Sequence, residues 1–415
     1  MKHSDSFYAD FMLGHAQRLR GLPEEAPSSL WRRVRVSTVD SLLACEDDAF
    51  FIPELNQAQS QGALRILNTS NLIDHWKVRR RFRRTLPRPT VALLSIKDAL
   101  VPRAQAFRPL LGRTAMVQEV HDRHDRIVSE SLQYHRGVVL RRAEAKKIRD
   151  GSASIAGTWI YMGLLHRHFG HFLVDSLPRL WPALLPTLKG RVGFLVDEGV
   201  HVSQDQTLFG QDSRDHFALT LLERLGLGRE RFLALEAHSR IEKLLVPVPV
   251  WRREHTHYYS TPMANDLWNS LRSERQNRPN RVYFTRRHFA ASGGGRPLSN
   301  EGAVEKLFES RGFTVIAPEE MALTEQLDLL ADSKVIAGTL GSNMFNAVFM
   351  HQGKSFVLAP GSLLTVAPVN LGRSAGIDTS LYVEPSQKHV TFNSKEPWQV
   401  DLAKLEAALD QANLQ

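Results

Sequence analysis

Hydrophobic and polar positions alternate most regularly in the second half of the chain. From about residue 190, the pattern predicts a buried strand over "RVGFLVDEG", a helix over "RDHFALTLLERLGLG" and a strand over "KLLVPVPV". The helix is expected to stop at its closing glycine, because glycine tolerates the backbone geometry at a helix end. This order of elements is a β-α-β unit.

A second series of the same kind begins after a predicted helix over "PMANDLWNSLRSERQNRPN", which ends in a polar, proline-bearing break. Strands are expected at "RVYFTRR", "FTVIAP", "KVIAG" and "SFVLAP", with helices over "NEGAVEKLFESRG", "LTEQLDLLADS" and "NMFNAVFMHQG". Short apolar runs separated by helices are typical of a parallel sheet covered on both faces. The sequence therefore predicts two α/β units with a hinge near residues 250–265.

The first 150 residues show a mixed pattern, with strands expected at "TVALLSI" and "GVVLRR" and loops at "EEAPSS" and "LPRP". A chain of 415 residues that is 42% hydrophobic is too long for one core, which favours two or more domains. The single cysteine, Cys45, excludes an internal disulfide and a cysteine-rich zinc site. No apolar run reaches the length of a secretory signal or a membrane span, so we expect a cytoplasmic protein.

The net charge of +9 is concentrated in the stretch "HWKVRRRFRRTLPR", which contains no acidic residue. Its basic residues are Lys77, Arg79, Arg80, Arg81, Arg83, Arg84 and Arg88. With Trp76 and Phe82 interleaved, the stretch suits an interfacial helix on an anionic membrane, a surface for a polyanionic glycan, or base stacking. A solvated basic face is the alternative. Because no nucleic-acid motif accompanies the run, no nucleic-acid partner is expected.

A glycine-rich turn, "KVIAGTLGSNMFNAVF", joins a predicted strand to a predicted helix. Gly338 and Gly341 permit close approach of a ligand to the backbone, and the N-terminus of the new helix attracts phosphate. The alternative is an ordinary corner in which Ser342 or Asn343 only caps the helix. The strand "RVYFTRR" brings Arg286 to the same edge of the sheet, and its guanidinium suits two phosphate oxygens. A diphosphate site is predicted there.

The stretch "HRHFGHFLVDSLPRLW" places His171 and Asp175 one helical turn apart, after Gly170. A carboxylate at this spacing can hold the tautomer of an imidazole and raise its basicity. A buried core histidine and an ordinary ion pair between Asp175 and Arg179 are the alternatives. His166 and His168 also suggest a metal, but only Asp175 stands at ligand spacing, so no metal site is predicted.

Three blocks, "HFLVDSLPRL", "RVYFTRR" and "RGFTVIAPEEMALTEQLDLLADSKVIAGTLGSNMFNAVFM", together resemble glycosyltransferase family 61. Members of that family carry, in this order, an H-x-x-x-D-x-x-P block, an Arg-ending strand, an E-Q helix and a G-x-H-G-A-x-x-x-N turn. The resemblance covers about residues 140–385. It implies an α/β, GT-B-like fold with two Rossmann-like lobes facing a cleft. It also implies inverting, metal-independent transfer of a hexose or pentose from a nucleotide-sugar donor to a glycan or polysaccharide acceptor, with no other cofactor.

The resemblance places Arg286 at the donor diphosphate and Glu325 near the donor. The donor-binding residues expected from it are Arg281, Arg286, Glu325, Gly338, Thr339, Gly341, Ser342, Asn343 and Asn346. An inverting displacement needs a base for the acceptor hydroxyl, and either His171 or Asp175 can be that base while the other orients it. The chain departs from the family pattern at Leu340, where a histidine is usual, and at Ala359–Pro360, where an acidic residue often closes the strand.

These inferences divide the chain into four expected parts. They are an N-terminal mixed region over 1–140, a first Rossmann-like lobe with the catalytic helix over 141–255, a nucleotide-sugar-binding lobe over 256–390 and a helical tail over 391–415. Arg79, Arg80, Arg83 and Arg84 are expected to form an acceptor or membrane surface, with peripheral association at the inner membrane face. The alternative function is a catalytically inactive module of the same fold that binds a nucleotide or a glycan.

Overall fold

In the computed structural model the protein consists of two compact units. The described residues are 35–36, 49–51, 61–68, 72–83, 91–103, 105–107, 115–135, 142–198, 216–254, 257–276, 280–291, 295–385 and 396–414. The first unit comprises residues 1–58, 87–252 and 261–267, and the second comprises residues 59–86, 253–260 and 268–415. The chain thus passes repeatedly between the units, most often between residues 252 and 268, where β12 (Trp251–Glu254), β13 (His257–Ser260) and α7 (Pro262–Asn269) lie.

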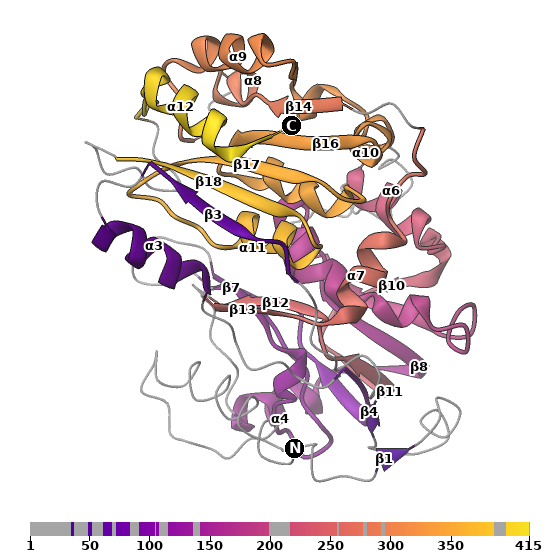
Figure 1. Cartoon of the computed structure of the whole chain (residues 1–415). Coiled ribbons are helices and arrows are strands. Elements are labelled where there is room, and N and C mark those ends of the chain that lie inside the picture. The colour runs from indigo at the N-terminus through magenta and orange to yellow at the C-terminus, as the bar shows by residue number, and fades with distance from the viewer. Residues whose placement is uncertain are drawn as a thin grey trace. The chain divides into compact units, whose positions relative to one another are not determined.

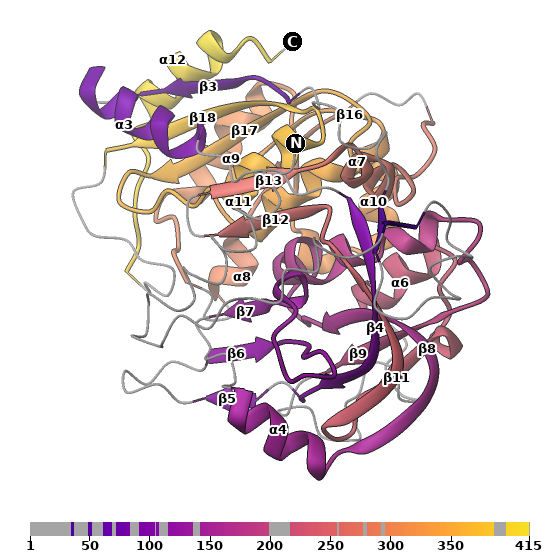
Figure 2. The same cartoon turned by 90° about the horizontal axis from the view of Figure 1, so that it is seen from below.

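The first unit is built on a seven-stranded sheet of order β1-β2-β4-β11-β8-β9-β10. The strands are β1 (Arg35–Val36), β2 (Ala49–Phe51), β4 (Ala92–Val101), β8 (Ala153–Leu164), β9 (Gly193–Asp197), β10 (Phe232–Ala234) and β11 (Ser239–Pro247). Strands β11, β8, β9 and β10 run parallel, whereas β4 pairs antiparallel with β2 and β11. The predicted strands at β4, β9 and β11 are confirmed, and Figure 2 shows β4, β11, β8 and β9 side by side.

The sheet of the first unit is buried on both faces along its central strands. In β4, Leu93 points to one face of the sheet and Leu94 and Ile96 point to the other, and all three are at most 1% exposed. Leu94 and Ile96 belong to a core that also contains Leu195 of β9 and Leu244 of β11. Burial on both faces explains why these strands read as continuous apolar runs in the sequence.

Short helices and a small second sheet complete the first unit. They are β5 (Gln105–Phe107), β6 (Ala115–Gln118), η3 (Ser129–Ser131), β7 (Gln133–His135), α4 (Arg142–Asp150), α5 (Phe169–His171), η4 (Phe172–Ser176), η5 (Leu177–Arg179), η6 (Trp181–Leu184), α6 (Phe217–Arg224) and η8 (Arg229–Arg231). The predicted helix at α6 is confirmed. The strand expected at "GVVLRR" lies outside the described residues except for Arg142, where the prediction is wrong because α4 begins there.

The second unit is built on a six-stranded, entirely parallel sheet of order β15-β14-β16-β17-β18-β3. Its strands are β3 (Leu64–Leu67), β14 (Asn280–Phe284), β15 (Thr314–Ile316), β16 (Ser333–Thr339), β17 (Lys354–Pro360) and β18 (Asp378–Glu384). All four strands predicted in this part are confirmed, and so is their parallel arrangement. Figure 1 shows β3, from the N-terminal part of the chain, lying beside β18 at the edge of this sheet.

Helices cover the sheet of the second unit. They are α3 (Leu72–Arg83), α8 (Arg287–Ala291), α9 (Glu301–Ser310), η9 (Pro318–Glu320), α10 (Leu323–Ala331), η10 (Ser342–Phe349), α11 (Ala367–Ser374) and α12 (Leu402–Ala412). Phe308 of α9 and Leu405 of α12 share a core with Tyr283 and Phe356 of the sheet. The predicted helices at α9 and α10 are confirmed, and the segment after the glycine-rich turn is a 3₁₀ helix, η10. The α/β class is therefore correct.

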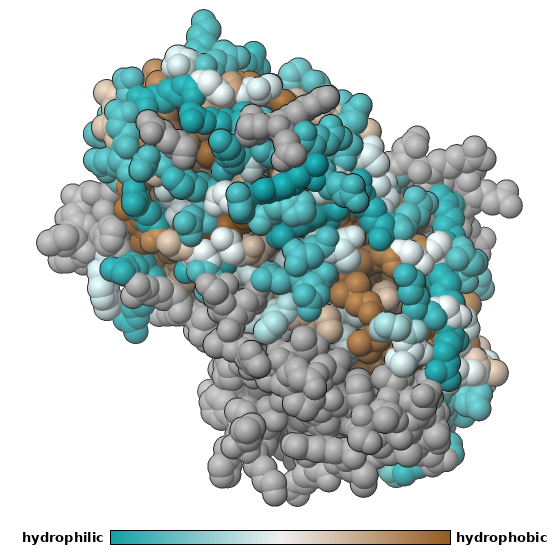
Figure 3. All heavy atoms as spheres, turned by 45° about the vertical axis from the view of Figure 1, so that its right-hand side comes forward, coloured by the Kyte–Doolittle hydropathy of each residue, from teal (hydrophilic) through white to brown (hydrophobic). Residues whose placement is uncertain are grey.

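The described surface is mainly polar. Figure 3 shows one face on which hydrophilic residues cover most of the described area. Among the described residues the large hydrophobic side chains that are exposed are Trp76, Phe289 and Leu402. None of the described helices combines the length and the apolar character that a membrane span requires.

Candidate functional site

His171 and Asp175 are in direct contact in the first unit. The Nδ1 atom of His171 lies 2.7 Å from Oδ2 of Asp175, and the two side chains are 26% and 27% exposed. An ionised carboxylate only accepts hydrogen bonds, so the proton of the imidazole belongs on Nδ1 and the lone pair remains on Nε2. The pair thus has the geometry in which a carboxylate fixes the tautomer of an imidazole, and both side chains are partly exposed to solvent.

The backbone of this pair is fastened to the end of β8. Gln133 Nε2 donates to the carbonyl of Asp175 at 2.8 Å and to that of Leu164 at 3.1 Å, while Gln133 Oε1 accepts from the Leu164 amide at 2.8 Å. Ser176 Oγ donates to the Leu164 carbonyl at 2.8 Å and accepts from the His166 amide at 3.1 Å. These bonds hold the helical segment at the carboxyl end of a parallel strand, which is where α/β proteins bind ligands.

The helix that carries the pair changes its geometry within the pair. His171 ends α5, and Asp175 lies in the π-helical turn η4, which is followed by the 3₁₀ turn η5. Single π-helical turns inside helices occur often at functional sites, because the wider turn alters the directions of side chains. The spacing of four residues predicted from the sequence still brings the two side chains together.

Arg179 has a structural role instead of an exposed ion pair. Its side chain is 1% exposed. The guanidinium donates to the carbonyls of Glu130 at 3.0 Å, Ser131 at 3.0 Å, Leu132 at 3.2 Å and Pro247 at 3.2 Å. The alternative of an exposed ion pair between Asp175 and Arg179 is therefore wrong, because Arg179 is buried among backbone carbonyls.

Two more imidazoles pack on His171. The ring of His166 stacks on it with centroids 5.1 Å apart, and the ring of His168 meets it edge-on at 5.4 Å. Within the part of the chain that the structure describes, no group of three or more His, Cys, Asp or Glu residues is arranged to hold a metal ion. The histidines of this stretch instead form a layer of rings around the contact with Asp175.

A basic and an acidic residue flank the same strand ends. Arg167 Nη2 lies 3.6 Å from Oε2 of Glu198, which directly follows β9 and is 7% exposed. Burial, and then the positive charge of Arg167, lower the pKa of His216. His216 Nδ1 accepts from the Ala218 amide at 3.2 Å and so caps α6 in its neutral form. The sequence did not indicate that Arg167 lies near Glu198 and His216, because these residues are far apart in the chain.

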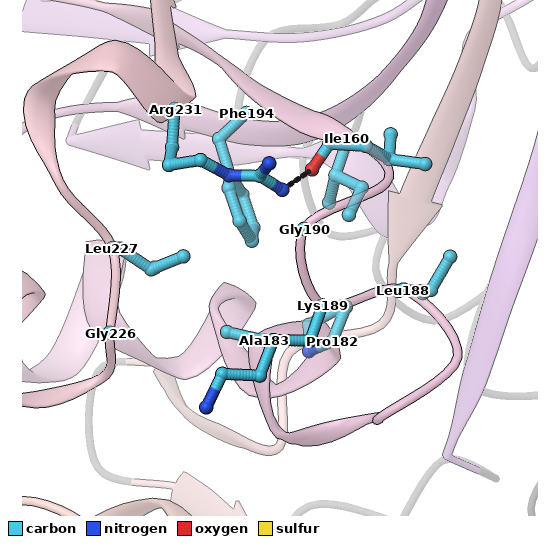
Figure 4. Close-up of a pocket in the computed structure, with 11 residues that line it drawn as sticks. Ile160, Pro182, Ala183, Leu188, Lys189, Gly190, Phe194, Gly226, Leu227 and Arg231 are labelled. Carbon is cyan, nitrogen blue, oxygen red and sulfur yellow. Dashed lines mark hydrogen bonds between the residues drawn. The ribbon is translucent and has the colours of Figure 1, made fainter.

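A pocket of about 180 Å³ lies elsewhere in the first unit (Figure 4). Ile160 of β8 and Phe194 of β9 form part of its apolar lining, and Arg231 donates to the carbonyl of Val192 at 2.5 Å beside it. Phe194 lies near the start of β9, whereas the segment with His171 leaves the end of β8. The residues that line the pocket do not include His171 or Asp175, so the pocket and this contact are separate features of the first unit.

In the second unit the glycine-rich turn and Arg286 come together as predicted. A Cβ atom on Gly341 would lie 2.7 Å from Arg286 Nη1 and 2.8 Å from Asn343 Oδ1. A Cβ atom on Gly338 would lie 2.9 Å from Asn343 Nδ2. The missing side chains thus leave room for the guanidinium of Arg286 and for the amide of Asn343, which folds back over the turn. Burial lowers the pKa of Arg286, although Glu301 and Glu319 oppose that effect.

A second arginine reaches the same turn. Arg296 Nη1 donates to the carbonyl of Leu340 at 2.7 Å, and Arg286 Nη2 donates to the carbonyl of Gly295 at 3.3 Å. Glu301 Oε1 accepts from the Arg286 amide at 2.7 Å. Arg296 was not among the predicted residues. Its only sequence signal is that it follows a run of glycines, which does not indicate where the side chain points.

The remaining predicted donor residues fall into two groups. Thr339 ends β16, and Ser342 and Asn346 lie in η10, so the structure brings them to the turn. Arg281 lies near the start of β14, where Nη1 donates to the carbonyl of Arg311 at 3.2 Å, and Glu325 Oε2 accepts from the Ala322 amide at 3.1 Å at the start of α10. Those two contacts support the fold locally and do not connect Arg281 or Glu325 with Arg286.

The basic run forms helix α3 in part. Arg79 and Arg80 are exposed, Trp76 is 57% exposed, and the guanidinium of Arg80 lies 5.2 Å from the centre of the Trp76 ring. Phe82 is fully buried, so its expected insertion into a membrane is wrong. Arg83 is the last residue of α3, and the predicted positions Arg84 and Arg88 lie outside the described residues.

The fold and these two sites define an α/β protein with an imidazole–carboxylate pair at one strand end and a basic, glycine-containing turn at another. The family model described as Glycosyltransferase 61 matches residues 169–357, a segment that contains both sites. The resemblance to glycosyltransferase family 61 is thereby confirmed. A match to this family model supports a glycosyltransferase, a class of enzyme that acts on a sugar donor and an acceptor. No curated protein matches the sequence.

Proposed function

We propose that the protein is an inverting, metal-independent glycosyltransferase that moves a hexose or pentose from a nucleotide-sugar donor to a glycan or polysaccharide acceptor. The observation that carries this proposal is the 2.7 Å contact between His171 Nδ1 and Asp175 Oδ2, which lies inside the segment matched by the family model. In this proposal the contact provides a positioned base, which is one of two things that an inverting transfer requires; the other is stabilisation of the leaving diphosphate.

In the proposed reaction His171 Nε2 removes the proton of the acceptor hydroxyl. The hydroxyl oxygen forms a bond to the anomeric carbon on the face opposite the donor diphosphate. The bond between that carbon and the diphosphate oxygen breaks, and its electron pair leaves with the phosphate, so the configuration inverts. Asp175 keeps the proton on Nδ1 and stabilises the imidazolium that forms. His171 is favoured as the base because Nδ1 is already engaged by the carboxylate and Nε2 is the atom with a lone pair to offer.

The leaving diphosphate needs positive charge, which Arg286 and the turn beside it would supply. A guanidinium binds two phosphate oxygens at once, and the amides at the start of a helix are oriented toward an anion. Arg286 already lies against Gly341 without a side chain between them. Because the base and the phosphate site belong to different units, the proposal includes a GT-B-like arrangement in which both units act on one donor.

We also propose that the protein works at an anionic membrane surface from the cytoplasmic side. The exposed side chains of Lys77, Arg79 and Arg80 on α3 support this, because basic residues are attracted to anionic lipid head groups. Trp76 is exposed on the same helix and suits the interfacial zone.

The proposal is tested with a panel of nucleotide sugars and two proteins, the wild type and Asp175→Asn. A true donor raises the Tm of both, since it binds only the folded state. Only the wild type then releases nucleoside diphosphate, slowly with water and faster with an acceptor glycan. If a donor raises the Tm of both proteins but the wild type releases no nucleoside diphosphate, the protein is an inactive binding module. This second function is considered because the buried Leu340 stands where the family usually has a histidine. Failure of every donor to stabilise the wild type would contradict both functions.

A further inference from the structure

The pocket of the first unit lies at the amino-terminal edge of its parallel strands (Figure 4). Phe194, the second residue of β9, pairs with Ile160 of β8, and both line the pocket. Arg231 lines it from the residue before β10, which runs parallel to β9. His171 and Asp175 instead follow the carboxyl-terminal end of β8. The pocket and the proposed base thus belong to opposite edges of the sheet.

The interior of the pocket is apolar. Its lining includes five hydrophobic residues that are each at most 5% exposed, namely Ile160, Leu188, Val192, Phe194 and Leu227. Figure 4 shows the side chain of Leu227 directed toward the middle of the pocket. The volume is about 180 Å³. Because an apolar cavity of about 150 Å³ can hold one benzene molecule, this pocket has room for an apolar body of about six carbon atoms.

Two cations stand beside this apolar interior. Arg231 Nη2 donates to the carbonyl of Val192 at 2.5 Å, which fixes the guanidinium next to the wall and leaves its other N–H groups as donors. The side chain of Lys189 lies along Gly226, where a Cβ atom would be 3.6 Å from Nζ. Both cations line the pocket, and in the part of the chain that the structure describes neither forms an ion pair with an acid.

The acid nearest to Arg231 in the sequence is directed elsewhere. Glu230 precedes Arg231, but its carboxylate lies against Gly228, where an added Cβ atom would meet both carboxylate oxygens. The described residues that line the pocket include no acid. The pocket therefore combines an apolar interior with positive charge that its own lining does not neutralise.

We infer that this pocket is a binding site for a small organic anion that has an apolar body of about six carbon atoms and one carboxylate. The apolar body leaves water for the wall formed by Phe194 and Leu227, which is favourable in proportion to the area buried. The carboxylate faces Arg231 and Lys189, and a guanidinium can donate to both carboxylate oxygens. The inference does not depend on the proposed function, because the pocket contains no residue of the proposed base or donor site.

The test compares three probes by ligand-detected NMR titration at low salt. Benzoate has both the ring and the carboxylate, benzyl alcohol has the ring without the charge, and acetate has the charge without the ring. We expect benzoate to bind at least about threefold more tightly than either of the others, since only benzoate uses both the apolar wall and the cations.

Four variants test the assignment to this pocket. Leu227→Phe adds a ring inside the pocket and should abolish benzoate binding. Arg231→Gln and Lys189→Gln each remove one charge and should weaken benzoate severalfold, a modest loss because both cations are partly or fully exposed to solvent, while benzyl alcohol binds as before. Lys146→Gln is the matched control, because Lys146 is an exposed cation of the same unit on α4, and it should behave as the wild type.

The inference is overturned if the wild type shows no saturable binding of benzoate or binds benzoate and benzyl alcohol equally. It is also overturned if Arg231→Gln and Lys189→Gln both keep the affinity of the wild type for benzoate. Thermal melts identify a variant that does not fold. Because Arg231 also binds the backbone of Val192, Lys189→Gln decides if Arg231→Gln is unfolded.

Two further variants exclude binding at the other basic places in the protein. His171→Ala and Arg286→Ala should each bind benzoate as the wild type does, since neither residue lines the pocket. Loss of benzoate binding in either variant would place the anion at the histidines or at the glycine-rich turn and refute the pocket. Sugar transfer is not a readout here, so failure of the proposed function would leave this result unchanged.

Discussion

His171 Nδ1 and Asp175 Oδ2 lie 2.7 Å apart across the junction between an α-helical and a π-helical turn. Hydrogen bonds of Gln133 and Ser176 connect the backbone of this segment to the end of β8. A backbone held in this way keeps the two side chains in position, as the proposed general base requires.

The first prediction concerns this pair. Asp175→Asn keeps the shape of the side chain and removes its charge, so the imidazole loses its fixed tautomer, and His171→Ala removes the base itself. Each variant should lose sugar transfer by at least about a hundredfold, the range typical of general bases, while the affinity for nucleoside diphosphate stays within a factor of about two. The double variant should be little worse than either single one, because the two residues act as a unit. Normal turnover in both single variants would show that the segment is structural.

The second prediction concerns the space left by Gly341. Gly341→Ala places a methyl group 2.7 Å from Arg286 Nη1, so the guanidinium must move and nucleoside diphosphate should bind several-fold more weakly. The backbone of Gly341 is extended, with φ at −174°, so the substitution strains the contact and not the backbone. Gly302→Ala in α9 is the control, because nothing lies within 4 Å of its added Cβ and a helical alanine stabilises. Calorimetric titration should separate the two variants, and identical affinities would refute the contact.

The third prediction concerns pH. Because burial lowers the pKa of His216 in the folded state, the unfolded chain binds a proton more readily as the pH falls below the ordinary value of about 6.5. This group therefore reduces stability progressively below that pH and has no effect well above it. His216→Asn keeps an acceptor for the Ala218 amide and does not titrate, so its urea midpoint should fall less between pH 7 and pH 5 than that of the wild type.

The control for the pH experiment is His124→Asn, at an exposed histidine of the same unit. This substitution should leave the acid dependence as it is in the wild type. His238, whose pKa is also lowered by burial, remains in His216→Asn and should preserve part of the acid sensitivity. Parallel pH profiles for wild type and His216→Asn would show that His216 does not contribute.

The fourth prediction concerns the basic helix α3. The wild type should float with anionic liposomes at low salt and be released as salt is added, since each basic residue near such a surface contributes about 1 kcal/mol. Changing Arg79, Arg80, Arg83 and Arg84 to Gln should abolish flotation. Trp76 is exposed on α3 whereas Phe82 is buried, so Trp76→Ala tests the apolar contribution and should weaken flotation moderately, because the charges of the helix remain.

A matched control for the membrane experiment comes from α4, a second basic helix. Its exposed residues Arg142, Lys146 and Lys147 can be changed to Gln without touching α3. That variant should float as the wild type does. Equal flotation of the α3 variant and the wild type, or no flotation of either at low salt, would remove the membrane role.

The sequence by itself determined the features that depend on local pattern. Apolar runs and turn residues predicted β14, β16 and β17 and the helices between them. This is possible because the periodicity of a strand or helix, and the residues that end a helix, depend on residues close together in the sequence. The spacing of His171 and Asp175 predicted their contact, since four residues make one helical turn. The position of Arg286 after a strand predicted its place at the glycine-rich turn, because parallel strands end at one edge.

Only the tertiary structure decided which distant segments meet. Nothing in the residues around β3 indicated that it would extend the sheet beside β18, nor around Arg296 that it would bind Leu340. The burial of Phe82 was equally hidden, because an aromatic residue in a basic run reads the same whether a core covers it or not. Contacts between distant residues leave no periodic pattern of hydrophobic and polar residues in the sequence. They follow from the packing of the whole chain, in which each pairing is fixed by the burial and hydrogen bonds that all the other segments leave available.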